Sequence, residues 1–356
     1  MENGSLDRII EGIKSNSKLV ARGSRTKTGI QFPADVGSLD LSTLSGIKEY
    51  NPSEYIFTAL AGTRIKEINL MLADNGQFLP FDPPLAARGA TLGGTVAANL
   101  SGPMRYHFGG VRDFILGVQF LDDQGKIIRT GGKVVKNAAG FDIPKLMVGS
   151  LGSLGTMVEL SLKVFPRPKE YISLVAKFEN LTDALNSLIE LTSSSFEILC
   201  LELHPQQDSY NVVVRLGGDP VLFEERCSQL EKLLQDVTYL EGEEESQTWG
   251  DNIEFNWVPE GAALVKVPLI PTQVPSLDGF LQDNNALRRY SAGANIAWIT
   301  WHKSIAEFDQ KLNELKLNGL TILGSTNQVR LGAQNKGVFY HKIKTALDPS
   351  GLWAEV

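Results

Sequence analysis

The sequence contains few of the residues that build metal centres or covalent cross-links. It has 2 cysteines and 4 histidines in 356 residues. They show no Cys-x-x-Cys or His-x-x-x-His spacing, so no preformed metal site is expected. Cys200 and Cys227 lie inside apolar patterns. We expect both to be buried, reduced thiols of a cytosolic protein.

The sequence also lacks the features of membrane-spanning, secreted and nucleic-acid-binding proteins. It contains no run of about 20 apolar residues, so no transmembrane helix is predicted. The first residues, MENGSLDRII, lack the basic and apolar regions of a signal peptide. The formal net charge of -7 is opposite to the basic balance of nucleic-acid binders. A composition of 42% hydrophobic and 21% charged residues fits a globular protein.

Length and composition predict two domains. A chain of 356 residues is longer than one average core needs. Two prolines in residues 164–171, VFPRPKEY, end the strand before them. We therefore expect one domain over residues 1–169 and a smaller one over residues 170–356. The acidic run Glu241–Glu245 is expected to be a solvated loop.

Alternating strand and helix patterns predict an α+β fold in both parts. Residues 156–165 alternate between apolar and polar side chains, as a half-buried strand does. Ile65, Ile68 and Leu72 share one helical face. Further strands are expected at residues 54–62, 114–121, 126–132, 198–204, 210–216, 263–268, 295–301 and 321–325, and amphipathic helices at residues 223–234 and 305–315.

A short basic segment near the N-terminus is the first candidate site. In ARGSRTKTG, residues 21–29, a glycine between cations suits a turn whose backbone N–H groups converge on an anion. Arg22, Arg25 and Lys27 would add positive charge. The alternative is a solvated basic loop.

Two segments poor in side-chain atoms follow, and 14 of the 34 glycines fall within Gly89–Gly155. Residues 91–102 would let a flat ligand lie close to the main chain, or would pack as a tight Ala/Gly turn or helix in the core. In residues 131–157 the spacing Gly149-Ser-Leu-Gly-Ser-Leu-Gly155 matches neither the dinucleotide-binding fingerprint nor a P-loop. The three segments together suit a large cofactor with a pyrophosphate and a flat ring system.

The order of these segments resembles the PCMH-type, or vanillyl-alcohol-oxidase-type, FAD-binding family, in the branch that contains FAD-binding subunits of glycolate oxidases. The resemblance is close over residues 20–170, and the tail KIKTALDPSGLW is similar to the ending of FAD-linked oxidases. It implies a PCMH-type FAD-binding domain of two α+β subdomains, followed by a smaller α+β cap domain.

The resemblance also implies which residues bind FAD. The pyrophosphate loop would be Arg22, Gly23, Ser24, Arg25, Thr26 and Lys27. The other two segments would contribute Thr91, Gly93, Gly94, Thr95, Ala98, Asn99, Gly102, Asp142, Gly149, Ser150, Gly152, Gly155 and Val158. No histidine lies in the loop, so non-covalent FAD is expected.

The sequence departs from the family pattern in several places. The family's pyrophosphate loop more often reads Arg-Gly-Gly-Gly-Ser/Thr, whereas Ser24 and Arg25 stand here. The His-x-Gly-Asp-Gly-Asn-x-His segment of the catalytic hydroxyacid dehydrogenases is missing. Relative to the family, the chain begins late and stops early.

The function implied is the FAD-binding subunit of a glycolate (2-hydroxyacid) oxidase or dehydrogenase complex. Its expected partners are a small 2-hydroxyacid, a catalytic FAD subunit and an iron–sulfur subunit, in the cytoplasm or at a membrane through the complex. Two alternatives are a self-sufficient flavin-dependent hydroxyacid dehydrogenase and a non-enzymatic assembly subunit that has lost FAD.

No catalytic residue is assigned from the sequence. Arg105, Tyr106 and His107 would reach the cofactor or a hydroxyacid, or form a polar surface loop. Lys136 and Asn137 would contact phosphate or flavin. The remaining candidates, Trp298 and Trp301, fit core packing better than a site above the flavin.

Overall fold

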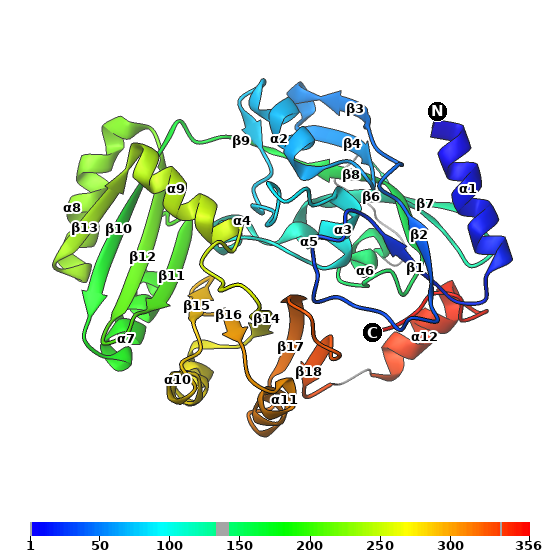
Figure 1. Cartoon of the computed structure of the whole chain (residues 1–356). Helices are drawn as coiled ribbons and strands as arrows, with labels where there is room; N and C mark the ends of the chain where they lie inside the picture. The colour runs from blue at the N-terminus through cyan, green and yellow to red at the C-terminus, as the bar shows by residue number, and fades with distance from the viewer. Residues whose placement is uncertain (1, 133–141, 335–336) are drawn as a thin grey trace.

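Two antiparallel sheets form the framework of the chain, and the computed structural model describes residues 2–132, 142–334 and 337–356 (Figure 1). The five-stranded sheet has the order β3-β4-β8-β6-β7. Its strands are β3 (Ile47–Asn51), β4 (Ile56–Leu60), β6 (Ile115–Leu121), β7 (Ile127–Gly131) and β8 (Thr156–Lys163). In β8 the side chains of Val158, Leu160 and Leu162 are buried, which confirms the strand predicted from the alternation.

Short helices surround this sheet. Helix α2 (Ile65–Ala73) buries Ile65, Ile68 and Leu72 as predicted. The others are α3 (Leu92–Ala97), α4 (Arg105–Phe108), α5 (Val111–Phe114) and α6 (Ile143–Met147). Helices α3 and α6 pack on the sheet strands themselves.

Two pairs of short strands complete the first part. Strand β1 (Leu19–Arg22) runs parallel to β2 (Gly37–Asp40), and β5 (Gln77–Phe78) pairs with β9 (Phe165–Pro166). The N-terminal helix α1 (Glu2–Ser15) packs Ile9 and Ile13 into a small core with β1 and β2.

The nine-stranded sheet has the order β13-β10-β12-β11-β15-β16-β14-β17-β18. Its strands are β10 (Glu170–Phe178), β11 (Cys200–Pro205), β12 (Tyr210–Gly218), β13 (Val237–Glu241), β14 (Ala263–Pro268), β15 (Arg288–Ser291), β16 (Ile296–Trp301), β17 (Asn318–Leu323) and β18 (Arg330–Gly332). The helices are α7 (Leu181–Ser193), α8 (Phe223–Leu234), α9 (Gly242–Ile253), α10 (Val274–Asp283) and α11 (Ile305–Glu314), with short 3-10 turns at Pro52–Glu54, Pro220–Leu222 and Pro271–Gln273. The strands predicted at residues 198–204 and 210–216 are present as β11 and β12, which pair in antiparallel fashion.

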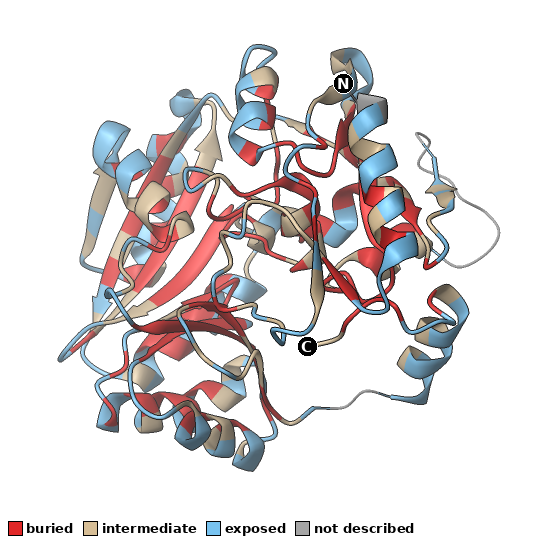
Figure 2. Cartoon of the chain, turned by 45° about the vertical axis from the view of Figure 1, so that its right-hand side comes forward, coloured by how far each residue is buried: buried red, intermediate tan, exposed pale blue. Residues whose placement is uncertain are grey.

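The two faces of this sheet have different partners, because alternate residues of a strand point to opposite sides. Val265 and Val267 of β14 pack with α7, α8, α10 and α11 in one core. Leu264 and Trp298 pack instead with Phe57 of the first sheet. Figure 2 shows the buried residues concentrated on the strands, with the outer sides of the helices exposed.

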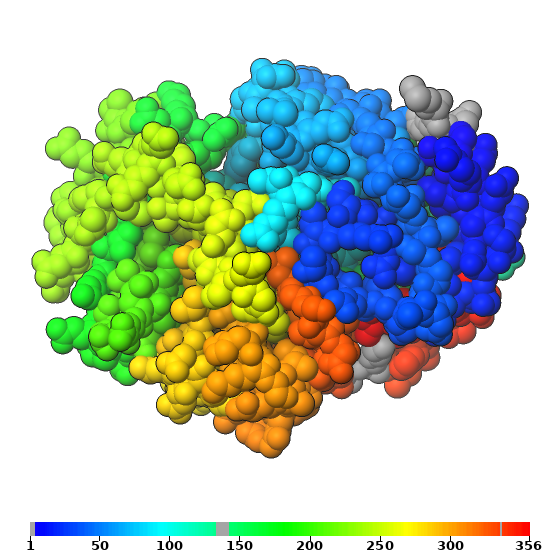
Figure 3. All heavy atoms as spheres, viewed as in Figure 1, coloured from blue at the N-terminus to red at the C-terminus, as the bar shows by residue number. Residues whose placement is uncertain are grey.

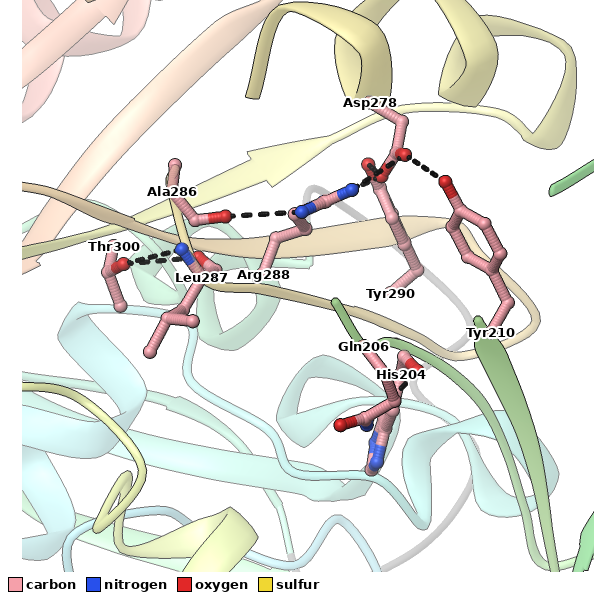
Figure 4. A network of polar contacts seen from close by, with 9 residues as sticks. All are labelled: His204, Gln206, Tyr210, Asp278, Ala286, Leu287, Arg288, Tyr290 and Thr300. Carbon is pink, nitrogen blue, oxygen red and sulfur yellow. Dashed lines mark hydrogen bonds and ion pairs between the residues drawn. The ribbon is translucent and has the colours of Figure 1, made fainter. Parts of the chain in front are cut away.

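Buried carboxylates fix helices to the nine-stranded sheet. Asp278 of α10 accepts hydrogen bonds from Arg288 (2.7 and 2.8 Å), Tyr290 (2.6 Å) and Tyr210 (3.0 Å), as Figure 4 shows. Glu245 of α9 forms a two-pronged ion pair with Arg215 at 2.7 and 2.9 Å. The prediction of a solvated loop at Glu241–Glu245 is therefore wrong, because this run begins a helix and places one carboxylate in the core.

The end of the chain returns to its beginning. Helix α12 (Val338–Leu347) is followed by Trp353, which pairs with Leu19 of β1 in a parallel bridge and lies in the same small core as α1. The main chain passes from the first sheet to the second between β9 and β10, where the sequence divides the chain at residue 169. That division stays a prediction.

We expect Asp348→Ala to destabilise the protein by about 3–5 kcal/mol, because it leaves a buried lysine without its counter-charge. The Asp348 side chain is fully buried and pairs with Lys344, and it also accepts the backbone N–H groups of Leu352 and Trp353. Denaturant unfolding measures the change. Lys342→Met on the exposed side of α12 is the matched control, and an equal effect of both substitutions would contradict the prediction.

Candidate functional site

One pocket brings together the three segments that the sequence singled out. Its volume is about 1180 Å³, counted to the open mouth. The sequence-predicted residues that line it are Arg22, Gly23, Ser24, Arg25, Thr26, Lys27, Thr91, Gly93, Gly94, Ala98, Gly152 and Gly155. Segments far apart in the sequence thus face one space, as a single ligand would require.

The loop after β1 supplies the positive charge of the pocket. Lys27 is partly buried, and desolvation of its ammonium group lowers its pKa to about 8. Burial also lowers the pKa of Arg22, with a smaller effect from the charge of Arg25. Within the described ranges, no carboxylate forms an ion pair with any of these three cations. Asp40 is near enough for the charge of Arg25 to lower the pKa of its carboxyl group, so the positive charge of the loop is offset only in part and favours an anionic ligand.

This loop keeps a tight backbone shape despite its two departures from the family pattern. Arg25 adopts φ 56°, the left-handed conformation that glycine reaches without strain. Gly29 N–H donates to the Ile322 carbonyl at 3.0 Å, and Gly324 N–H donates to the Thr28 hydroxyl at 3.0 Å. Figure 3 shows this blue loop against the orange segment of the second sheet. The nine-stranded sheet therefore helps to hold the loop in place.

The glycines at the start of α3 allow close approach of neighbouring chain segments. A Cβ on Gly23 would lie 2.3 Å from the Thr91 hydroxyl oxygen, and one on Gly93 would lie 2.8 Å from the Ala61 Cβ. The Thr91 hydroxyl accepts the Gly94 N–H at 3.3 Å and caps the helix. Gly94 faces Lys27, whose Nζ lies 3.8 Å from the position of a Cβ there. The expected tight packing is present at Gly93, which also lines the pocket with Gly94 and Ala98, and the contact of this segment with a ligand stays a prediction.

The third segment contributes a glycine-punctuated turn. Gly152 and Gly155 adopt positive φ angles of 84° and 141°. The Ser150 hydroxyl accepts the Gly152 N–H at 3.3 Å and shapes the turn. A Cβ on Gly155 would lie 2.7 Å from the Phe120 ring, so the turn lies directly on the sheet.

The other predicted residues do not line the pocket. Four of them lie in or next to α3 and the glycine turn: Thr95, Asn99, Gly149 and Ser150. Gly102 packs on Asp82, and Val158 lies in the small N-terminal core. Asp142 caps α6 at the surface. The Thr95 hydroxyl is buried without a partner among the described residues. Lys133, Lys136 and Asn137 lie outside the described residues.

Sequence reasoning missed part of the pocket wall. The additional lining residues are Ala21, Thr28, Ile30, Gln31, Phe32, Leu41, Ala61, Ala97, Leu151 and Met157. Several of them flank the predicted segments. Leu41 and Ala61 gave no local signal, because only the pairing of β1 and the packing of α3 bring them there.

The cluster Arg105, Tyr106 and His107 forms α4 at the junction of the two sheets. Tyr106 packs against Gly293 of the second part, and His107 is exposed, 4.0 Å from Glu197. The described residues contain no group of His, Cys, Asp or Glu that could hold a metal ion. They also contain no helix long and apolar enough to cross a membrane.

The fold and pocket agree with the family comparison. Residues 6–131 match the model of the FAD binding domain. Two structures of alkyldihydroxyacetonephosphate synthase superpose with TM-scores of 0.69 and 0.70 at 14% and 12% identity, covering 97% and 98% of this chain and 73% and 74% of theirs. Residues 6–131 are thus similar to FAD binding domains, and the chain shares its fold with these two structures.

Over part of its length, the chain is also similar to subunits of glycolate oxidase. It is 40% identical to glycolate oxidase subunit GlcE of Escherichia coli over 185 residues, 52% of this chain and 53% of the relative. It is 30% identical to a D-lactate dehydrogenase of Anaerostipes hadrus over 191 residues (52% and 40%), and 28% identical to glycolate oxidase subunit GlcD of Bacillus subtilis over 231 residues (63% and 49%). The chain spans about half the length of these relatives or less.

Gly23→Ala should lower stability by about 1–3 kcal/mol, because the new methyl group would press on the Thr91 hydroxyl that caps α3. Thermal and denaturant unfolding measure the effect. Gly250→Ala is the control: it lies inside α9 with open space around its Cβ position, and alanine should stabilise that helix slightly. A neutral Gly23→Ala would show that the two segments are not in close contact.

Proposed function

We propose that this chain binds FAD non-covalently in the pocket and serves as the FAD-binding subunit of a 2-hydroxyacid oxidising complex of the glycolate oxidase kind. The observation that supports it most directly is a pocket lined by close-packed glycine backbone and by three cations that form no ion pair with a described carboxylate. FAD provides two phosphate charges and a flat ring system, which match these two features.

The pyrophosphate is assigned to the loop after β1 and the start of α3. Lys27 Nζ faces Gly94 at the beginning of that helix, where its charge would neutralise one phosphate. Arg22 and Arg25 would neutralise the rest. Backbone N–H groups of the loop add hydrogen bonds that need no side chain.

Bound FAD supplies a two-electron acceptor for the hydride that leaves a 2-hydroxyacid. The protein supplies position and a low-dielectric wall. Ala97, Ala98, Leu151 and Met157 line the pocket with small or apolar side chains and would exclude water from the cofactor. The residues 91–102 would then lie along it as far as the junction with the second sheet.

The proposed partners are a catalytic FAD subunit and an iron–sulfur subunit, with a small 2-hydroxyacid as the substrate of the assembly. Two of the relatives are named as subunits of glycolate oxidase. The missing histidine-rich segment of the catalytic dehydrogenases supports a role beside a catalytic subunit. The complex would be cytoplasmic, with any membrane contact made through its other subunits.

A self-sufficient hydroxyacid dehydrogenase is the second candidate, favoured by the similarity to D-lactate dehydrogenase. Purified chain that reduces an artificial acceptor with glycolate or D-lactate would support it. The third candidate, an assembly subunit that has lost FAD, is less well supported. Arg25 adopts the left-handed backbone conformation that glycine would adopt at this position in the family, so the loop keeps its shape.

The decisive experiment is an absorbance spectrum of the purified chain before and after addition of FAD. We expect flavin bands that remain with the protein after gel filtration. The melting temperature should rise with FAD in excess, because the ligand binds only the folded state. Absence of flavin bands and of any shift in melting temperature would reject FAD binding.

The affinity for FAD should depend on pH through Lys27. Its pKa of about 8 in the free protein means that the ammonium is charged below that pH and loses its proton above it. Binding of phosphate favours the charged form, so the Kd for FAD should rise as pH increases beyond about 8. Lys27→Arg should remove this dependence, and Lys27→Met should weaken binding about 10-fold or more at pH 7. A pH profile unchanged in Lys27→Arg would assign the titration to another group.

A further inference from the structure

Lys266 of β14 is a buried cation at the junction of the two sheets. Its side chain points away from Val265 and Val267, towards the first sheet, and the residue is only 7% exposed. Its Nζ donates a hydrogen bond to the Asn99 carbonyl at 2.8 Å. The ring of Trp298 lies 5.9 Å from the same Nζ.

This lysine has no counter-charge among the described residues. The charged group that acts on it most strongly is Arg105, a second cation. Burial lowers the pKa of Arg105, the charge of the nearby Asp113 carboxylate partly offsets this, and Asp113 also accepts the Gly110 N–H at 2.8 Å. The positive charges of Lys266 and Arg105 therefore repel each other at a largely buried junction.

Three other largely buried cations of the described residues pair with carboxylates, whereas a fourth, Arg289, donates to the Asn252 amide oxygen at 2.7 Å. Arg215 pairs with Glu245, Arg288 with Asp278 and Lys344 with Asp348. Burying a charged group without a partner of opposite charge costs free energy, and a bound anion would supply the missing partner. Burial and Arg105 together lower the pKa of Lys266 to about 7, and a bound anion would restore the charged form.

We propose that Lys266 and Arg105 bind a small carboxylate at this junction, the carboxylate of the 2-hydroxyacid substrate. That identity rests on the proposed function, whereas the anion site itself rests on the two cations. Asn99 comes directly after Ala98, which lines the pocket, so the site lies at the end of the wall assigned to FAD. Lys266 retains two N–H groups for a carboxylate oxygen, and the guanidinium of Arg105, whose charge Asp113 offsets in part, has further N–H groups for the second oxygen.

Oxalate, a dicarboxylate that cannot be oxidised as a hydroxyacid, is the probe. Binding to the full chain is followed by tryptophan fluorescence, because Trp298 lies next to Lys266. Lys266→Met should weaken oxalate binding about 10-fold or more, and Lys266→Arg should retain most of it. Lys311→Met is the matched control: Lys311 also lies over an aromatic ring, Phe280, but already pairs with Glu314.

Equal oxalate affinity in the native chain and in Lys266→Met would overturn the proposal. The same holds if Lys266→Met changes the affinity for FAD but not for oxalate, which would assign the lysine to the cofactor. If Lys266→Met does not fold, Arg105→Gln replaces it and should also weaken oxalate binding. Oxalate binding that depends on Lys266 in a chain unable to bind FAD would reject the proposed function and leave the carboxylate site standing.

Discussion

The pocket depends on one buried ammonium group near the end of the chain. Lys344 Nζ pairs with Asp348 and donates to the carbonyls of Ser153 (2.6 Å) and Trp353 (2.7 Å). Ser153 belongs to the glycine turn that forms the third wall, and Trp353 pairs with Leu19 immediately before the basic loop. Because a buried cation must keep its acceptors, this lysine holds two of the three walls at fixed positions. The C-terminal segment KIKTALDPSGLW therefore has a structural role, because its Lys344 fixes the positions of two pocket walls.

Given that clamp, the shape of the pocket follows from close contacts between backbones. Gly23 meets Thr91, and Gly93 meets Ala61, at distances that leave no room for a methyl group. Such contacts cannot relax around a larger side chain without moving the strands behind them. The glycine-rich composition thus reflects chain-to-chain packing as well as exposure of backbone to a ligand. The two requirements fall on neighbouring residues, which explains why the sequence alone could not separate them.

Local patterns predicted the elements, but not the contacts between distant segments. The alternation in residues 156–163 and the helical face of Ile65 and Leu72 depend only on neighbours in sequence, and both were predicted correctly. Glu245 was misassigned because its partner, Arg215, lies 30 residues earlier on another strand. The contact of Lys266 with Asn99 joins residues 167 positions apart, and no periodicity encodes it. The basic loop and the glycine segments were identified because their composition itself is unusual.

Charge distribution links these observations. The chain has a net charge of -7, yet Lys27 in the pocket wall, and Lys266 and Arg105 at the junction, form no ion pair with a described carboxylate. Arg215, Arg288 and Lys344, three largely buried cations elsewhere in the described residues, pair with carboxylates. The net negative charge of the chain repels small anions at long range. Positive groups between low-dielectric walls create a local field that would attract an anionic cofactor and an anionic substrate to this place. The nine-stranded sheet accordingly does more than cover the five-stranded sheet: its β14 carries Lys266, one of the charges on which binding there would depend.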